Sequence, residues 1–183
     1  MQHTLILDST SAAETEALAT ALAHRLIESS IGNVERENSP TTGSFPSLHP
    51  FSNTGLNKSG ILITLEGELG AGKTVFVRGL ARGLGIPTEA ITSPTYVLQH
   101  IYRGGRLLLY HMDAYRIAGG AREFEASGLL ECLDDPQAVV CLEWPERLAG
   151  FQWPTDRIKV EIEHCDMERR RIKLASMGPR AIH

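Results

Sequence analysis

The feature that most constrains the fold of this chain is the segment at residues 67–74, which reads G-E-L-G-A-G-K-T and matches the pattern G-x-x-x-x-G-K-T. An apolar run rich in β-branched residues precedes it at residues 61–66, and a segment with the apolar spacing of a helix follows it at residues 75–84. A strand, a glycine-rich loop and a helix in this order distinguish a phosphate-binding P-loop from a chance match. We therefore predict a P-loop and call residues 67–74 the glycine loop.

The residue types of the glycine loop suit a bound phosphate chain. Glycines let the backbone curl so that successive N–H groups point at phosphate oxygens, and the N-terminus of the following helix adds partial positive charge. The ammonium group of Lys73 can reach the outer phosphates, and the hydroxyl of Thr74 can ligate Mg²⁺. The flanking pattern disfavours the alternative, a glycine-rich turn with a surface lysine. We expect a nucleoside triphosphate with Mg²⁺, held by Gly67, Leu69, Gly70, Ala71, Gly72, Lys73 and Thr74.

Composition and charge limit the classes of protein to which this chain can belong. Its 183 residues fit a single domain with a substantial core. The net charge of −4 argues against a general nucleic-acid surface, so we expect any contact with RNA to come through a partner. The three cysteines show no C-x-x-C spacing, which fits reduced thiols in the cytoplasm. We expect neither a secretory signal nor a membrane helix, which would need about 20 consecutive apolar residues.

The part of the chain before the glycine loop divides into a patterned and an irregular segment. Residues 4–7 form a short apolar run that predicts an edge strand. Ser11 and Glu14 fit a capping box with Ser11 at the N-cap, and the apolar spacing predicts a helix that ends near Glu28. Residues 29–58 are dense in Ser, Thr, Asn, Gly and Pro, so we predict a flexible insertion in a single domain of residues 1–183. A tolerated insertion is favoured over a functional lid.

The part that follows the glycine-loop helix predicts a hairpin. Pro94 favours an extended backbone, and residues 91–102 have the composition of a strand. Gly104 and Gly105 predict the turn of the hairpin, and residues 107–112 predict its second strand.

The C-terminal half predicts a buried central strand and two peripheral ones. Residues 121–133 predict a helix that Gly128 weakens. The continuous apolar run at residues 138–142 is typical of a strand buried on both faces of a parallel sheet. Residues 157–163 and 170–175 alternate in polarity and predict antiparallel strands. We therefore predict an α/β fold of the P-loop NTPase type, with three layers, a mainly parallel central sheet and added antiparallel strands.

Two acidic residues follow apolar strands and are candidates for the chemistry near Mg²⁺. Glu143 follows the most apolar strand and Asp113 the next most apolar one. Ligands of open α/β sheets bind outside the carboxyl ends of the strands, so both side chains could face the phosphates. The pattern favours Glu143 for the metal, with Asp113 orienting the attacking water or assisting the metal.

Two further candidates have polar side chains whose position in the sequence leaves their role open. Thr95 could sense the terminal phosphate, because hydroxyl groups on mobile loops can join a Mg²⁺ shell, or it could be a turn residue beside Pro94. A run of three arginines could contact the nucleotide or a partner, although a solvated strand edge is favoured; these residues are Arg169, Arg170 and Arg171.

Four motifs occur along the chain in this order: the glycine loop, S-P-T-Y at residues 93–96, Y-H-M-D-A-Y-R at residues 110–116 and E-W-P at residues 143–145. Their order and spacing resemble those of the bacterial TsaE family of tRNA threonylcarbamoyladenosine biosynthesis. The resemblance covers most of the chain between residues 61 and 144, and the N-terminal S-x-x-E-T at residues 11–15 also fits. Glu68, where the family more often has Asp, and the long segment 29–58 depart from the family pattern.

The resemblance implies a small P-loop ATPase that binds ATP and Mg²⁺ and hydrolyses ATP slowly. It implies that Lys73 and the loop amides hold the phosphates, while Thr74 and Glu143 lie at the metal. It also implies that Thr95 belongs to a switch-like segment and that Asp113 is needed for hydrolysis.

The resemblance further places Ser11 at the nucleotide, and Trp144 near the nucleotide or a partner surface. The implied partner is the TsaD–TsaB complex, which transfers a threonylcarbamoyl group to an adenosine beside the anticodon. The tRNA would then reach this chain only indirectly, through the complex.

Three other functions share parts of the same pattern. A small-molecule kinase would need an arginine-bearing lid, for which only residues 169–171 qualify. A GTPase would need a base-reading N-K-x-D motif, and none follows the glycine loop. A nucleotide-gated binding module would bind ATP as a signal, with hydrolysis incidental.

Overall fold

The described residues form one seven-stranded sheet with the order β1-β7-β6-β2-β5-β4-β3. The computed structural model describes residues 3–35, 60–154 and 156–177. The strands are β1 (His3–Ser9), β2 (Ile61–Glu66), β3 (Gln99–Tyr102), β4 (Leu108–Asp113), β5 (Ala138–Glu143), β6 (Arg157–His164) and β7 (Arg170–Ser176).

The centre of the sheet is parallel and both of its edges are antiparallel. Strands β6, β2, β5 and β4 pair in parallel, whereas β7 pairs antiparallel with β6, β1 with β7, and β3 with β4. Every residue of β5 is buried, as the continuous apolar run predicts for a central parallel strand. The predicted fold class is therefore confirmed, as are the edge strand near residue 4 and the two antiparallel strands of the tail.

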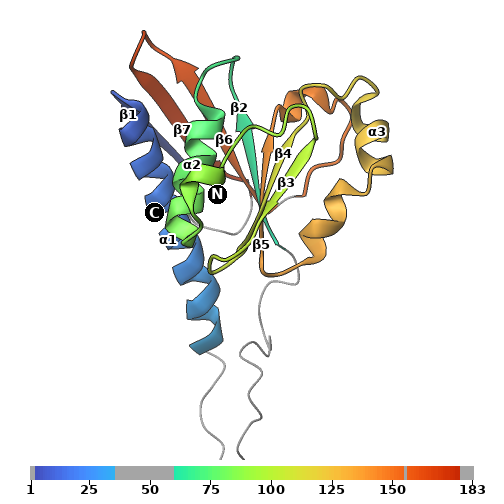
Figure 1. The fold of residues 1–183 in the computed structure, drawn as a ribbon, viewed down its shortest axis with the longest axis horizontal. Coiled ribbons are helices and arrows are strands. Elements are labelled where there is room, and N and C mark those ends of the chain that lie inside the picture. Colours follow the sequence, from blue (N-terminus) through green and yellow to red (C-terminus); the bar gives the residue numbers. More distant parts are fainter. Residues whose placement is uncertain (1–2, 36–59, 155, 178–183) are drawn as a thin grey trace, which may run out of the picture.

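Helices cover both faces of this sheet (Figure 1). Helices α1 (Ala12–Glu35) and α2 (Lys73–Leu84) lie side by side on one face. Helix α3 (Gly120–Ala126) and the 3₁₀ helix η2 (Leu129–Asp134) cover the other face. Each face has its own apolar core, and the larger one lies between the sheet and the pair α1 and α2. The two cores hold the central strands, and hence their carboxyl ends, in fixed positions.

The contact between α1 and α2 depends on two glycines. A Cβ atom at Gly79 would lie 2.2 Å from the backbone oxygen of Glu16, and one at Gly83 would lie 2.7 Å from that of Thr20. The hydroxyl of Thr20 donates to the backbone oxygen of Gly79 at 2.9 Å. The two backbones approach closely because no side chain intervenes at these glycines.

The start of α1 follows the predicted capping box only in part. The Glu14 N–H donates to the Ser11 hydroxyl oxygen at 3.2 Å, which confirms Ser11 as the N-cap. The carboxylate of Glu14, however, accepts from the Thr10 N–H at 2.6 Å, one residue before the N-cap. The helix also continues to Glu35, so the predicted end near Glu28 is wrong for residues 29–35. Polar composition disfavoured a helix there without forbidding one. The rest of the predicted insertion, residues 36–58, lies outside the described part of the chain.

Two other predicted elements differ from the structure. Residues 91–98 do not form a strand: residues 91–94 have no regular secondary structure, and a turn follows in which the N–H groups of Val97 and Leu98 both donate to the Pro94 carbonyl, at 3.0 and 2.7 Å. Strand β3 therefore contains only Gln99–Tyr102. The helix predicted at residues 121–133 is divided into α3 and η2, because Gly128 adopts a left-handed conformation with φ of 68°.

Two short 3₁₀ helices, η1 (Thr88–Ala90) and η3 (Pro145–Arg147), follow α2 and β5. Within residues 3–35, 60–154 and 156–177, no helix is both long enough and apolar enough to span a membrane.

Candidate functional site

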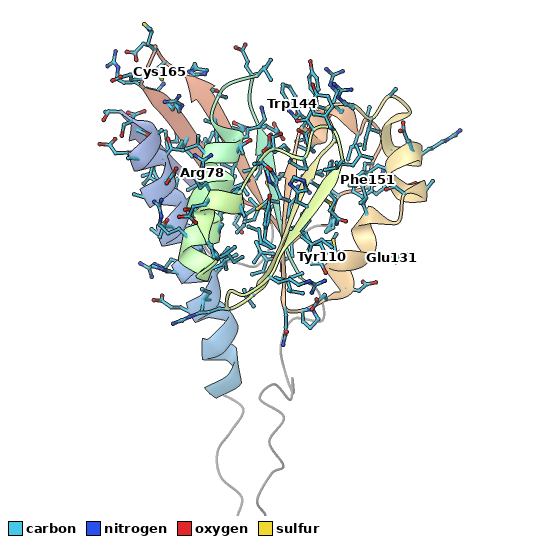
Figure 2. All side chains as sticks on the ribbon, in the orientation of Figure 1. Arg78, Tyr110, Glu131, Trp144, Phe151 and Cys165 are labelled. Atoms are coloured by element: carbon cyan, nitrogen blue, oxygen red, sulfur yellow. The ribbon has the colours of Figure 1, made fainter. Side chains whose placement is uncertain are left out.

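Three chain segments meet at the carboxyl ends of the parallel strands. Strand β2 leads into the glycine loop, β5 ends at Glu143 and β4 ends at Asp113. The strand register pairs Glu143 with both Leu65 and Asp113. Trp144, the next residue after β5, lies at the end of the sheet from which the glycine loop rises (Figure 2). The structure thus brings the glycine loop and both predicted acidic residues to the end of the sheet at which the parallel strands terminate, as parallel pairing requires.

The glycine loop has a backbone that requires glycine. Gly67, Gly70 and Gly72 have φ angles of 147°, 81° and 111°, in a region that side chains other than glycine rarely adopt. A Cβ atom at Gly67 would also lie 2.4 Å from the backbone oxygen of Ile162. Gly72 is the N-cap of α2, and no side chain caps this helix. The first N–H groups of α2 are therefore not satisfied by a side-chain cap, which suits an anion.

The ammonium group of Lys73 is held inside the site. Its Nζ donates to the backbone oxygens of Gly67 and Glu68 at 2.7 and 2.9 Å and lies 3.8 Å from the centre of the Trp144 ring. Burial lowers the pKa of Lys73, whereas the nearby carboxylates, Glu143 foremost, act in the opposite direction. A mostly buried cation at the mouth of the glycine loop is arranged to meet a bound anion.

Thr74 and Glu143, the two residues predicted to hold a metal, are joined by a direct hydrogen bond. The hydroxyl of Thr74 donates to Oε1 of Glu143 at 3.0 Å, and Nε2 of His111 lies 2.8 Å from the same oxygen. His111 and Glu143 are both buried. The residues fit Mg²⁺, which takes one or two protein oxygens together with water and phosphate oxygens. The described residues contain no cluster of three or more His, Cys, Asp or Glu that could hold a metal ion.

Asp113 is joined to the turn that contains Thr95. The hydroxyl of Thr95 donates to Oδ2 of Asp113 at 2.5 Å, and that of Ser93 donates to the same oxygen at 3.3 Å. The other carboxylate oxygen, Oδ1, accepts from the Tyr115 N–H at 2.7 Å. The two candidates Asp113 and Thr95 are therefore joined by a half-buried hydrogen bond, which connects the turn to the end of β4.

The hairpin of β6 and β7 also reaches the glycine loop. Nε of Arg170 donates to the backbone oxygen of Ala71 at 2.9 Å, and Nε2 of His164 lies 3.0 Å from that of Gly70. Cys165 marks the tip of this hairpin, at the same end of the sheet as Trp144 (Figure 2). No local pattern in the sequence predicts these contacts with the loop backbone, because they join residues far apart in the chain.

The other two arginines of the run lie at a solvated strand edge, as the favoured interpretation of the run predicts. Arg169 pairs with Asp166 at 2.5 Å, and Arg171 pairs with Asp8 at 3.2 Å, both on the exposed surface. Only Arg170 turns towards the glycine loop, so the interpretation of the whole run as a solvated edge is wrong for this residue.

The hydroxyl of Ser11 serves the N-cap of α1 rather than a contact with the glycine loop. Nearby, Ser9 pairs with Arg170 in the sheet, and this pairing brings the start of α1 towards the end of the sheet that carries the glycine loop. A contact of Ser11 with a nucleotide stays a prediction.

The fold and the arrangement of the glycine loop with Glu143 and Asp113 define a P-loop NTPase-like α/β protein. A family model described as "Threonylcarbamoyl adenosine biosynthesis protein TsaE" matches residues 9–172. The chain therefore belongs to the TsaE family.

Individual relatives and a solved structure agree with this assignment. The chain is 42% identical to a tRNA threonylcarbamoyladenosine biosynthesis protein TsaE of Bacillus subtilis, over 67% of this chain and 74% of the relative. It is 37% identical to the protein of the same name from Streptomyces coelicolor, over 68% of this chain and 86% of the relative. A crystal structure of Bacillus subtilis YdiB matches with a TM-score of 0.62 and 28% identity, over 97% of this chain and 88% of that one.

Proposed function

We propose that this protein binds ATP with Mg²⁺ at the glycine loop and hydrolyses it slowly, as a subunit required for the threonylcarbamoyladenosine modification of tRNA. The observation that carries this proposal is the convergence of Lys73, the joined pair of Thr74 and Glu143, and Asp113 around the glycine loop. Family membership supplies the pathway.

The phosphate chain of ATP would lie along the glycine loop. The N–H groups at the start of α2 have no side-chain cap, and the Lys73 ammonium group is already directed into the loop. The ammonium group of Lys73 would exchange its two backbone carbonyl acceptors for oxygens of the outer phosphates, since a phosphate competes well with such carbonyls for a buried cation.

Thr74 and Glu143 would hold Mg²⁺ beside the phosphates. The hydroxyl of Thr74 donates its proton to Glu143, which leaves its oxygen lone pairs available to a cation. When bound, Mg²⁺ would offset the negative charge of the outer phosphates.

Asp113 would orient the attacking water. In this structure Oδ2 of Asp113 accepts hydrogen bonds from Thr95 and Ser93, so it is engaged by the segment around Pro94. Hydrolysis would then require this segment to move, which would account for the slow turnover that we expect in the absence of a partner.

The partner in this proposal is a TsaD–TsaB complex, and the tRNA is reached through that complex rather than by this chain. The net charge of −4 supports an indirect contact, because a direct one would need a basic surface. Hydrolysis would reset or remodel the complex.

The proposal is tested by measuring ATP hydrolysis with Mg²⁺, for the protein alone and with a TsaD–TsaB pair. We expect slow hydrolysis alone, a changed rate with the pair, and no binding or hydrolysis in Lys73→Ala. Indifference of the rate to the pair would separate the protein from this complex, and transfer of the terminal phosphate to a metabolite would indicate a kinase instead.

Asp113→Ala separates binding from turnover. We expect ATP affinity within about 3-fold of the wild type and a loss of hydrolysis of at least about 100-fold, as for removal of a general base or water-orienting group. Full hydrolysis in this variant would contradict the role of Asp113. If the variant lost turnover but still supported product formation by the complex, ATP binding alone would be the signal.

A further inference from the structure

A buried histidine lies beside the proposed metal site, and the proposed function assigns it no role. His111 lies on β4 and is fully buried. Its Nε2 lies 2.8 Å from Oε1 of Glu143, and within the described part of the chain its Nδ1 has no hydrogen-bond partner. A buried polar atom without a partner is costly. An apolar side chain of similar size would avoid this cost, so packing alone does not explain a histidine here.

The hydrogen bond to Glu143 defines which ring nitrogen of His111 carries the proton. A carboxylate can only accept, so Nε2 must be the donor. We assign the Nε2–H form of His111 on this basis.

Two donors therefore converge on one oxygen of Glu143 from two different elements. Thr74 at the start of α2 donates at 3.0 Å, and His111 on β4 donates at 2.8 Å. A carboxylate held by a single hydrogen bond can rotate about its last side-chain torsions. With two donors on Oε1, those torsions are restrained and the second oxygen keeps a constant direction.

We propose that His111 is a positioning residue, which orients the carboxylate of Glu143 for Mg²⁺ through its Nε2–H donor. This inference rests on the proposed function, since it requires Mg²⁺ to bind beside Thr74 and Glu143. His111 itself contacts neither the nucleotide nor the metal in this scheme. Groups that orient a metal ligand in this way typically contribute about 10-fold to 100-fold in metal affinity.

The test uses two amide substitutions that differ only in reach. The Nε2 atom of a glutamine occupies nearly the place of the histidine Nε2, whereas the amide of an asparagine ends near the place of Nδ1. His111→Gln therefore keeps a donor for Glu143, and His111→Asn moves the donor away. Both variants bury an uncharged amide on the same strand, so a purely structural effect would appear in both.

The measurement is equilibrium binding of a fluorescent ATP analogue, first in EDTA and then over a series of Mg²⁺ concentrations. In EDTA we expect all three proteins to bind the analogue equally, because the glycine loop is unchanged. In the Mg²⁺ series we compare the Mg²⁺ concentration that gives half of the full change in analogue binding. We expect this concentration to rise about 10-fold or more for His111→Asn and less than about 3-fold for His111→Gln. Thermal unfolding of each variant shows whether the fold is retained.

The outcomes separate this inference from the proposed function. If the wild type responds to Mg²⁺ and His111→Asn responds at the same concentration, the positioning role is wrong while the proposed function stands. Equal weakening in both variants would also overturn it, since that indicates packing. If the wild type shows no effect of Mg²⁺ on binding, the proposed function fails and this inference fails with it. Should His111→Asn not fold, the comparison of His111→Gln with His111→Phe decides by the same criteria.

Discussion

At the scale of single residues, Glu143 connects the largest number of parts of the site. Its carboxylate accepts from Thr74 and from His111, and its backbone oxygen accepts from the Ala114 N–H at 3.0 Å. The next residue, Trp144, has a left-handed backbone with φ of 62°, and its ring faces the Lys73 ammonium group. A conformation of this kind is uncommon for a tryptophan. The chain therefore changes direction directly after Glu143, and this turn places Trp144 over Lys73.

The three cysteines allow a residue-scale prediction about reactivity. Burial raises the pKa of Cys132 to about 12 and raises that of Cys141 as well, whereas Cys165 is exposed on the β6–β7 hairpin. Only the thiolate reacts. With raised pKa values, Cys132 and Cys141 stay protonated at pH 8 and would ionise only in far more alkaline solution.

We therefore expect one fast-reacting thiol in the folded protein at pH 8, measured with a chromogenic disulfide reagent. Cys165→Ser should remove the fast reaction, and urea should release the other two thiols. A second fast thiol in the folded Cys165→Ser variant would contradict the raised pKa values of Cys132 and Cys141.

At the scale of elements, the close contact between α1 and α2 fixes the helix that follows the glycine loop. Glu16 on α1 pairs with Arg82 at 2.7 Å and with Arg78 at 3.3 Å, both on α2. The two glycines of α2 remove the side chains that would otherwise separate the helices. The start of α2, and with it Lys73 and Thr74, is therefore positioned by α1 as well as by the sheet.

We expect Gly79→Ala to destabilise the protein even though alanine favours a helix by about 1 kcal/mol over glycine. The new Cβ atom would lie 2.2 Å from the Glu16 oxygen, so the helices must move apart. Overpacking of this kind costs about 1–3 kcal/mol or more. We expect a net loss of about 2 kcal/mol, or about 4–8 °C in Tm, measured by thermal and urea unfolding.

Arg78→Ala is the control on the same helix. It removes an ion pair with Glu16 whose arginine is 37% exposed, and such pairs contribute at most about 1 kcal/mol. A Gly79→Ala variant as stable as the wild type would show that the two helices separate without cost.

At the scale of the whole molecule, the site is assembled from both ends of the described chain. The glycine loop lies between Glu143 on one side and the hairpin of β6 and β7 on the other. The hairpin is in turn paired with β1, the first strand of the chain. Contacts of Arg170 and His164 with the loop backbone connect the C-terminal hairpin to the proposed nucleotide site.

We expect Arg170→Ala to weaken ATP binding about 10-fold and Arg171→Ala to change it less than about 2-fold. Arg170 donates a charged hydrogen bond to the glycine loop, and a bond of this type contributes about 1.5–3 kcal/mol when it is not fully exposed. Arg171 pairs with the exposed Asp8 and serves as the control. Equal affinities of both variants, measured by equilibrium binding with Mg²⁺, would show that the hairpin does not support the loop.

The sequence alone determined the parts of this protein whose cause is local. The glycine loop, the buried strand β5 and the acidic residues at the ends of β4 and β5 follow from residue types and spacing along a short stretch. The parallel arrangement that joins them follows from the same pattern, because buried apolar strands alternate with helices.

Only the tertiary structure decided which distant residues meet. The order of the strands brings Arg170 to the glycine loop and His111 to Glu143. The carbonyl of Pro94 holds the following residues, up to Leu98, in a turn instead of the strand that their composition favours. Each of these depends on hydrogen bonds between atoms placed by packing elsewhere in the molecule. Such contacts leave no periodic signal in the sequence, and tertiary context overrides local preference where the two conflict.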